Sequence, residues 1–239
     1  MQMRSLVKRL LSPVFYLIAD RRRGLVMEAE FWDRWMAQRG GPWSEDFSAR
    51  FDPARQISGW HAEILRLLGP NPRILDVGAG PVTAIGRVWD GNLLDVTAID
   101  PLAATYDALL AKHNLVPPVR TRTCAGEDLA RMFAAGTFDW VNAQNCIDHA
   151  EEPIQAIRSM VQTCAEGGIV SLFHEENEAV KESWRGLHQW NFGLQAGQLT
   201  LSGRNGRQVA VDMALVGMAF QTERRGDHLL SIGKKRRIS

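Results

Sequence analysis

The sequence predicts an α/β fold with a mostly parallel sheet and helices on both faces, and two features carry this prediction. The first is an apolar strand at residues 73–77 that runs into the turn Gly78-Ala79-Gly80, where glycine lets the backbone approach a ligand closely. The second is a strand at residues 96–100 that ends on Asp100, twenty residues after Gly80. A strand, a glycine turn, a helix and a second strand ending in a carboxylate form the ribose-binding half of a nucleotide site.

The residues around the glycine turn favour a ligand with an ammonium group over a dinucleotide. A dinucleotide fingerprint has a third glycine, and this chain has Thr83 at that position. The carboxylate of Asp76, at the mouth of the turn, would repel a pyrophosphate. The same carboxylate suits S-adenosylmethionine, which combines an adenosine with an ammonium and a sulfonium. An NAD-type oxidoreductase is the alternative within the enzymes.

Strand and helix signals continue to alternate after Asp100. A helical stretch leads to a strand at residues 119–124, and Phe138-Asp139-Trp140-Val141 begins the next strand. A helix is expected over residues 153–165, because apolar residues recur there at helical spacing. A glycine pair ends this helix, and a strand follows at residues 169–173.

Taken in order, Leu75-Asp76-Val77-Gly78-Ala79-Gly80 and these later segments resemble the class I S-adenosylmethionine-dependent methyltransferase family. The resemblance covers roughly residues 58–239. It implies a seven-stranded, mostly parallel Rossmann-like sheet with helices on both faces and an antiparallel last strand. Residues 220–224 and 228–232 would be the sixth and seventh strands of that sheet.

The resemblance divides the chain into two parts, an N-terminal helical cap or lid at residues 1–57 and the methyltransferase domain at residues 58–239. Within the domain, the insert 174–211 would form part of the acceptor lid. Residues on both sides of Asn205-Gly206 alternate between apolar and polar, which predicts a hairpin there. In the cap, Phe31 and Trp35 lie four residues apart, so a helix would turn both to one face.

The resemblance also implies which residues contact the cofactor. Asp100 would accept hydrogen bonds from the ribose hydroxyls, and Gln144 and Asn145 would approach the methionine part. An acidic loop after the third strand would lie beside the adenine, and such a loop also suits an ordinary helix cap. The predicted cofactor residues are Asp76, Gly78, Ala79, Gly80, Asp100, Pro101, Gly126, Glu127, Asp128, Gln144 and Asn145.

Three histidines are candidates for a general base, since neutral imidazole titrates near working pH. They are His149, which follows the fourth strand, and His174 and His188, which lie in the insert. The alternatives are a histidine that packs or positions the substrate, and a lid helix with a capped end. No two histidines stand at a close metal-binding spacing, so the sequence predicts no metal site. The candidates for acceptor binding are Trp35, Arg50, Glu175, Trp190 and Asn191.

Composition and charge bear on the partners. The formal net charge of the 239 residues is only +1, which argues against a protein that binds nucleic acid by bulk charge. The apolar content of 45% and the charged content of 23% are ordinary for a soluble globular protein. Three cysteines without close spacing give neither a disulfide framework nor a zinc pattern. They indicate a reducing, cytoplasmic setting.

The N-terminal residues 1–23 combine arginine and lysine with an apolar run at residues 13–19. The run is far shorter than the roughly 20 residues that a helix needs to cross a bilayer. Two interpretations stay open. The segment would pack on the domain or on a second subunit, as in a homodimer, or it would lie on an anionic membrane surface.

The function that the sequence predicts is methyl transfer from S-adenosylmethionine to an oxygen or nitrogen of a small-molecule acceptor. The reaction would be an in-line displacement, in which the protein holds the acceptor close to the methyl group. The alternative from another class is a non-catalytic partner subunit that keeps the fold and docks through its N-terminal segment.

Overall fold

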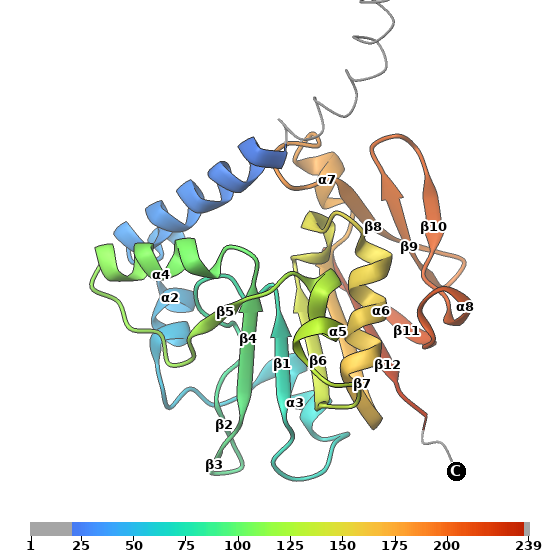
Figure 1. Cartoon of the computed structure of the whole chain (residues 1–239), viewed down its shortest axis with the longest axis horizontal. Coiled ribbons are helices and arrows are strands. Elements are labelled where there is room, and N and C mark those ends of the chain that lie inside the picture. Colours follow the sequence, from blue (N-terminus) through green and yellow to red (C-terminus); the bar gives the residue numbers. More distant parts are fainter. Residues whose placement is uncertain (1–20, 237–239) are drawn as a thin grey trace, which may run out of the picture.

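The structure is a computed structural model that describes residues 21–236, apart from the side chains of residues 213 and 214. A seven-stranded sheet in the order β11-β12-β7-β6-β1-β4-β5 forms its centre (Figure 1). β12 pairs antiparallel with both neighbours, and the other adjacent strands are parallel, as predicted. The strands are β1 (Ile74–Val77), β4 (Val96–Asp100), β5 (Thr121–Thr123), β6 (Phe138–Gln144), β7 (Cys164–Glu175), β11 (Phe220–Arg225) and β12 (His228–Lys234).

Helices cover both faces of this sheet. α6 (Pro153–Thr163) and α5 (Leu129–Met132) lie in front of it in Figure 1, and α3 (Gly59–Leu65) lies behind β1. α6 begins with Pro153, which suits the first helical turn because proline lacks a backbone N–H. It buries Ile157 and Met160 against the sheet, so the helical spacing seen in the sequence marks the face that packs.

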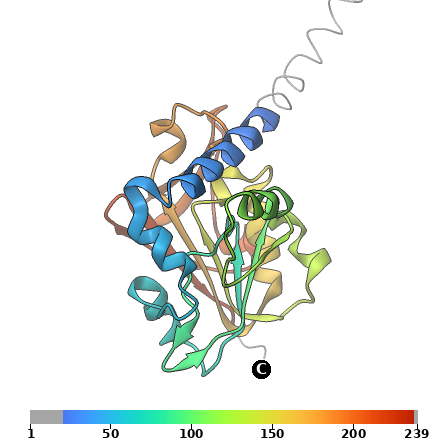
Figure 2. The same ribbon diagram turned by 90° about the vertical axis from the view of Figure 1, so that its left-hand side faces the viewer.

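The chain before the sheet forms a helical cap. A helix covers residues 21–37 and crosses above the carboxyl ends of the strands (Figure 2). We call it the N-terminal helix. η1 (Gly41–Trp43) and α2 (Ser44–Phe51) follow it, and α4 (Ala103–Lys112) packs beside them.

The aromatic face of the N-terminal helix differs from the prediction. Trp35 is buried, with its ring 4.9 Å from that of Phe47. Phe31 is exposed instead of sharing that face. Trp32 is the neighbour that turns inward, with its ring 5.2 Å from that of Trp35. Met36 is buried as well as Trp35, and at 100° per residue the direction midway between them lies about 10° from Trp32 and about 90° from Phe31.

The helix predicted between the glycine turn and β4 does not form. Residues 81–87 are a loop, and a small hairpin of β2 (Val88–Trp89) and β3 (Asn92–Leu93) follows. Its turn residues Asp90 and Gly91 both have positive φ, 49° and 76°, which is the geometry that Asp-Gly favours in two-residue hairpins. The backbone N–H groups of Arg87 and Val88 donate to the carbonyl of Arg55, so this segment pairs with the chain before α3.

The insert after β7 forms a small sheet of its own. α7 (Glu178–Lys181) is followed by the antiparallel strands β8 (Trp190–Gln195), β9 (Gln198–Gly203) and β10 (Gln208–Ala210). The predicted hairpin at Asn205-Gly206 joins β9 to β10. α8 (Met213–Val216) leads back to β11. Phe192 and Leu201 belong to the same buried cluster as α6, so the insert packs beside that helix.

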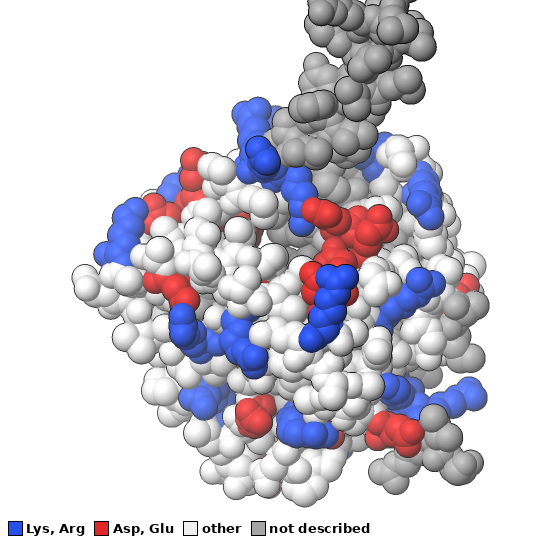
Figure 3. All heavy atoms as spheres, in the orientation of Figure 1, with Lys and Arg blue, Asp and Glu red and all other residues white. Residues whose placement is uncertain are grey.

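Charge is mixed over the described surface. Figure 3 shows lysine and arginine interspersed with aspartate and glutamate on the face that it draws, with one acidic group above the middle. The three cysteines are free. Among residues 21–236, no helix combines the length and the apolar character that a membrane crossing requires. The predicted membrane or subunit contact through residues 1–23 falls almost wholly outside the described residues.

Candidate functional site

Two adjoining cavities lie at the carboxyl ends of β1, β4 and β6. The first, of about 150 Å³, is lined by the glycine turn, Asp100, Gln144 and His149. The second, of about 70 Å³, runs from Gly78 and Asp100 to Gly126 and also reaches His149. Parallel sheets bind ligands at this edge, and the structure brings most of the predicted site residues to it.

The glycine turn is held in a conformation that only glycine adopts easily. Gly78 and Gly80 have φ angles of 66° and 63°, in the left-handed region. A Cβ at residue 78 would overlap Cys146 and stand 2.6 Å from its Sγ. Burial raises the pKa of the Cys146 thiol well above its usual range, so the thiol stays protonated and donates to the Val77 carbonyl.

Asp76 lies deeper than the mouth of the turn. It is buried, and its two carboxylate oxygens accept hydrogen bonds from the Thr83 hydroxyl (2.6 Å) and the Asn142 amide (2.8 Å). Burial raises the pKa of Asp76, whereas these two hydrogen bonds lower it. The carboxylate thus fixes β1 to β6 and to the loop of Thr83, and it borders the first cavity from below.

Asp100 lies at the end of β4, where both cavities meet. Its oxygens accept hydrogen bonds from the backbone N–H groups of Leu102 (2.8 Å) and Gly80 (3.1 Å). A carboxylate can accept about four hydrogen bonds, so two remain for ribose hydroxyls. Burial raises the pKa of Asp100 to about 6, with the charges of Glu28 and Asp76 acting in the same direction.

The first cavity offers matching groups for the amino acid part of S-adenosylmethionine. Gln144 lines this cavity, and its side-chain oxygen is buried without a hydrogen-bond partner among the described residues. Its contact with His61 influences the pKa of that histidine but lacks hydrogen-bond geometry. Arg50 lines the same cavity and uses two of its five donors, on Asp46 and on the Val82 carbonyl. An acceptor for an ammonium and a donor for a carboxylate are therefore present, and these residues fit the cofactor.

All but one of the other predicted cofactor residues border one of the two cavities. Pro101, Gly126 and Glu127 line the second cavity. Asp128 pairs with Arg131 at 2.7 Å on the surface and lines neither cavity. Asn145 borders the first cavity, although its side-chain oxygen accepts a hydrogen bond from the Glu175 backbone.

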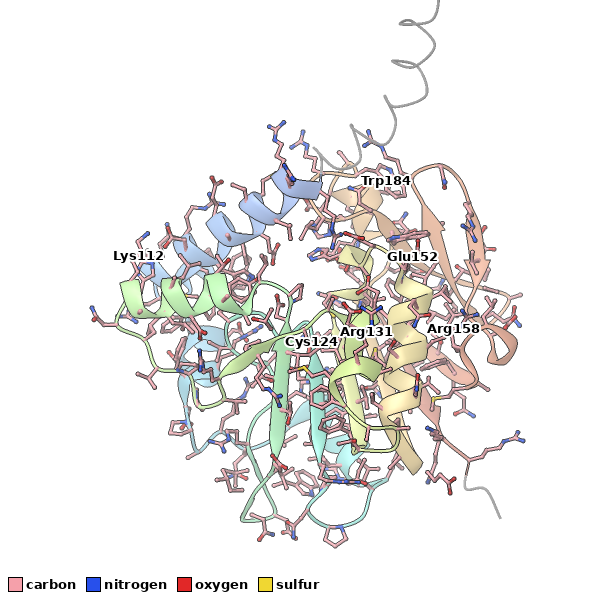
Figure 4. The ribbon with its side chains drawn as sticks, in the orientation of Figure 1. Lys112, Cys124, Arg131, Glu152, Arg158 and Trp184 are labelled. Carbon is pink, nitrogen blue, oxygen red and sulfur yellow. The ribbon has the colours of Figure 1, made fainter. Side chains whose placement is uncertain are left out.

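Glu127 also binds the start of α6. Its Oε1 accepts hydrogen bonds from the backbone N–H groups of Glu151 (2.9 Å) and Glu152 (3.2 Å). A carboxylate at a helix N-terminus satisfies amides that have no partner within the helix. Figure 4 shows Glu152 at this end of α6, on the same side of the molecule as Trp184 of the insert.

Two of the three predicted catalytic histidines contact each other beside the cavities, and one of them, His149, lines both cavities. His149 comes from η3 (Ile147–His149) and His188 from the loop between α7 and β8. The distance from His149 Nε2 to His188 Nδ1 is 3.2 Å, and Asp148 Oδ2 lies 2.8 Å from His188 Nδ1. We call these three residues the His–His–Asp cluster.

Within this cluster, the charges of Asp148 and the histidines shift one another's pKa values in the direction opposite to the effect of burial. Burial acts to lower the pKa of His188, but the hydrogen bond and charge of Asp148 outweigh it, and the pKa is raised. Burial acts to raise the pKa of Asp148, but the neighbouring histidines lower it. Burial and the charge of Asp148 raise the pKa of nearby Glu178 to about 7.

His174, the third predicted catalytic histidine, has a different position. Its Nε2 accepts hydrogen bonds from the backbone N–H groups of Ile147 (3.1 Å) and Cys146 (3.3 Å). Burial lowers the pKa of His174 to about 4. Its basic nitrogen is thus occupied in shaping the turn after β6, and it lines neither cavity.

The predicted acceptor residues are spread over several sites. Trp35 belongs to the core of the cap, and Asn191 is buried with its oxygen on the Val180 N–H. Glu175 pairs with Lys181 at 2.5 Å. Trp190 lines a third cavity of about 590 Å³, which shares Ala150 and Leu187 with the second. Arg50, as described, lines the first.

The sequence prediction missed several residues that border the site. Glu28 and Trp32 of the N-terminal helix line the first cavity, and Tyr106 of α4 lines the second. The Trp32 indole donates to Glu28 at 2.8 Å. For Trp32 the sequence contains one signal, because the aromatic residues of the cap recur at helical spacing. Asp148 had a clearer signal, since it directly precedes His149.

Comparison with known proteins finds a family match for the central part of the chain. Residues 75–172 match a family described as a methyltransferase domain. The match begins in β1 and ends in β7, so it contains the glycine turn, Asp100 and His149. The N-terminal helix and the insert with His188 lie outside it.

The individual proteins that match this chain share little sequence identity with it. An uncharacterized methyltransferase of Schizosaccharomyces pombe is 27% identical over 114 residues, which are 45% of this chain and 41% of that protein. The chain thus matches less than half of that relative's length. Among solved structures, Burkholderia thailandensis 1,6-didemethyltoxoflavin-N1-methyltransferase, with bound 1,6-didemethyltoxoflavin and S-adenosylhomocysteine, is 14% identical with a TM-score of 0.48, and the match covers 91% of each chain. A Thermotoga maritima protein described as a possible histamine N-methyltransferase is 13% identical with a TM-score of 0.48, covering 87% of this chain and 99% of that one.

Proposed function

We propose that this chain, whose residues 75–172 match a methyltransferase domain family, uses S-adenosylmethionine to methylate an oxygen or nitrogen of a small-molecule acceptor. The observation that carries the proposal is the pair of cavities at the carboxyl edge of the sheet. They join the groups that suit the cofactor to His149, the member of the His–His–Asp cluster that lines both cavities.

The cofactor, when bound, supplies an electrophilic methyl group on a sulfonium. In the proposal, Asp100 accepts hydrogen bonds from the ribose hydroxyls and Gln144 accepts one from the ammonium group. Arg50 donates to the carboxylate. Trp32 and Glu28 of the N-terminal helix cover the glycine turn and exclude water from the reacting atoms.

The acceptor would approach from the side of His149, because this residue lines both cavities. The third cavity adjoins through Ala150 and Leu187, and its size falls in the range typical of small-molecule sites. Leu187 and Trp190 give it an apolar wall, which suits an acceptor with an apolar body. The main contribution to rate would be positioning, since the acceptor atom must stand about 3 to 3.5 Å from the methyl group and in line with the sulfur.

His149 and His188 are the proposed proton acceptors for the nucleophile. His149 lines both cavities, and His188 lies behind it, 3.2 Å from His149 Nε2 and oriented by a 2.8 Å hydrogen bond with Asp148. His174 is left out of this role, because its Nε2 is held by two backbone N–H groups.

The first test is calorimetric titration of the purified chain with S-adenosylmethionine, S-adenosylhomocysteine and NAD in parallel. We expect binding of the first two and none of NAD. Asp100→Ala and Gly78→Arg should each weaken binding at least tenfold. Asp107→Ala is the matched control, since Asp107 is a surface residue of α4 paired with Arg120. Unchanged affinity in both site variants would refute the site assignment.

A screen of small acceptors with labelled methyl groups follows if the cofactor binds. Binding of NAD alone would favour an oxidoreductase. Binding of S-adenosylmethionine without transfer to any acceptor would favour the non-catalytic partner subunit.

A further inference from the structure

Three atoms able to ligate a metal converge beside the cofactor cavities from two segments distant in sequence. His188 Nδ1 stands 2.8 Å from Asp148 Oδ2 and 3.2 Å from His149 Nε2, and the third separation, His149 Nε2 to Asp148 Oδ2, is 3.4 Å. Atoms bound at 2.0 to 2.1 Å to one zinc ion stand about 2.9 Å apart in an octahedral site and about 3.3 Å apart in a tetrahedral one. The observed triangle falls close to this range. An ion at that bond length from all three would lie roughly 0.9 Å outside their plane.

The second oxygen of Asp148 gives an independent indication. Asp148 is 1% exposed, and its Oδ1 has no hydrogen-bond partner among the described residues. A buried carboxylate oxygen without a partner is costly, and native proteins rarely leave one unsatisfied. A cation bound by this carboxylate would offset the cost of burying its negative charge.

From this geometry we propose that Asp148, His149 and His188 form a binding site for one divalent transition-metal ion of the Zn²⁺ type. Two imidazole nitrogens and one carboxylate oxygen are the donor set of several catalytic zinc sites. Nitrogen donors disfavour Mg²⁺ and Ca²⁺, which prefer oxygen. Three protein ligands leave at least one coordination position for water or an oxygen of the acceptor, and a bound ion would replace the proton-acceptor role proposed above for the two histidines.

Neighbouring groups suit such an ion. The side chains of His149 and His188 are 19% and 23% exposed, so an ion can reach them. The Gln189 N–H donates to the Asp148 carbonyl, which holds the insert against η3. Glu178 Oε1 lies 3.9 Å from His188 Nδ1 and adds negative charge when ionised. A nearby cation, Arg21, donates to the His149 carbonyl and is paired with Glu151.

The test uses the full chain without a histidine tag, stripped with a chelator and titrated with Co²⁺ under visible absorption. We expect saturation at one Co²⁺ per chain and displacement by Zn²⁺, but not by a hundredfold excess of Mg²⁺. His188→Gln should weaken Co²⁺ binding at least tenfold, and Asp148→Asn should do the same. His113→Gln is the matched control, because His113 also pairs with a carboxylate, Asp33, but far from the cluster.

Two further measurements distinguish loss of the metal site from unfolding of a variant and from loss of cofactor binding. Thermal unfolding shows whether each variant folds, and His188→Gln, at a partly exposed position, keeps the test valid if Asp148→Asn does not fold. Affinity for S-adenosylhomocysteine is measured on the same samples, so loss of the proposed function is seen apart from loss of the metal site. A wild-type chain that takes up no Co²⁺, or a His188→Gln variant that binds it as tightly as wild type, would overturn the proposal.

Discussion

Asp76 and Asp100 carry the same charge and occupy neighbouring strands, yet their surroundings give them different roles. Asp76 is enclosed, and both of its oxygens bind side chains of the protein. Asp100 binds two backbone N–H groups and still borders both cavities. A sequence motif marks both residues, but only the local contacts distinguish a structural carboxylate from one that is available to a ligand.

Asp100 should make cofactor binding depend on pH. Burial raises its pKa to about 6 in the free protein, and ribose hydroxyls donate hydrogen bonds to the ionised form. Affinity for S-adenosylhomocysteine should therefore be constant above pH 7 and fall as the pH drops through 6, by up to tenfold per pH unit. Calorimetric titration between pH 5 and 8 measures this. Asp100→Asn should bind weakly with no such slope, and an equal affinity of the wild type at pH 5 and 7.5 would contradict the prediction.

Between β1 and β4 the chain replaces the expected helix by a loop and a hairpin. The loop is tied to the rest of the structure by specific groups. Thr83 bridges Asp76 and the Ile85 N–H, and the carbonyl of Arg55 accepts from Arg87 and Val88. This element leaves the glycine turn packed against Cys146 on one side and Trp32 on the other. The turn is therefore held by tertiary contacts and not by the first turn of a following helix.

Gly78→Ala should destabilise this element by more than backbone strain alone. The new Cβ would overlap the side chain of Cys146, so we expect a loss of about 3 kcal/mol or more in the free energy of unfolding. Gly91→Ala is the matched control, since its φ of 76° is similar and nothing lies within 4 Å of its Cβ. It should lose only about 1 kcal/mol. Urea unfolding of both variants gives the comparison, and equal losses would show that the Cys146 contact does not matter.

At the scale of the whole molecule, β12 is the last strand along the chain, and it joins the sheet beside β7 after the insert. β12 pairs with β7, and Lys235 then reaches the C-terminal end of α6. Its Nζ donates to the carbonyls of Val161 (2.9 Å) and Cys164 (2.7 Å). Carbonyls at a helix C-terminus lack partners within the helix and favour a cation. Residues some seventy positions apart are thereby joined at the end of the sheet opposite the site.

Lys235→Met should weaken this contact and lower the global free energy of unfolding by about 1 to 2 kcal/mol, because charge-assisted hydrogen bonds to the helix end are lost. Lys234→Met, at the exposed neighbouring position, should change it by less than about 0.5 kcal/mol. Chemical denaturation of the two variants tests the difference. Cofactor affinity should stay the same in both, since Lys235 lies far from the cavities.

Local patterns in the sequence determined the sheet and half of the site. Alternating strand and helix signals gave the order of the elements, and the motifs placed Gly78, Gly80 and Asp100 at one edge. These features depend on neighbouring residues, whose spacing alone fixes which side chains share a face. The helix expected before β4 failed because Asp90-Gly91 and the carbonyl of Arg55 favour a hairpin there.

Only the tertiary structure decided how distant polar side chains combine. His149 and His188 are 39 residues apart, so no spacing rule could join them, and although Asp148 directly precedes His149, no local pattern pairs it with His188. It also gave no reason to separate His174, which faces two backbone N–H groups instead of the site. The physical reason is that hydrogen bonds, burial and charge act through space, and their partners are known only once the insert has packed on the turn after β6.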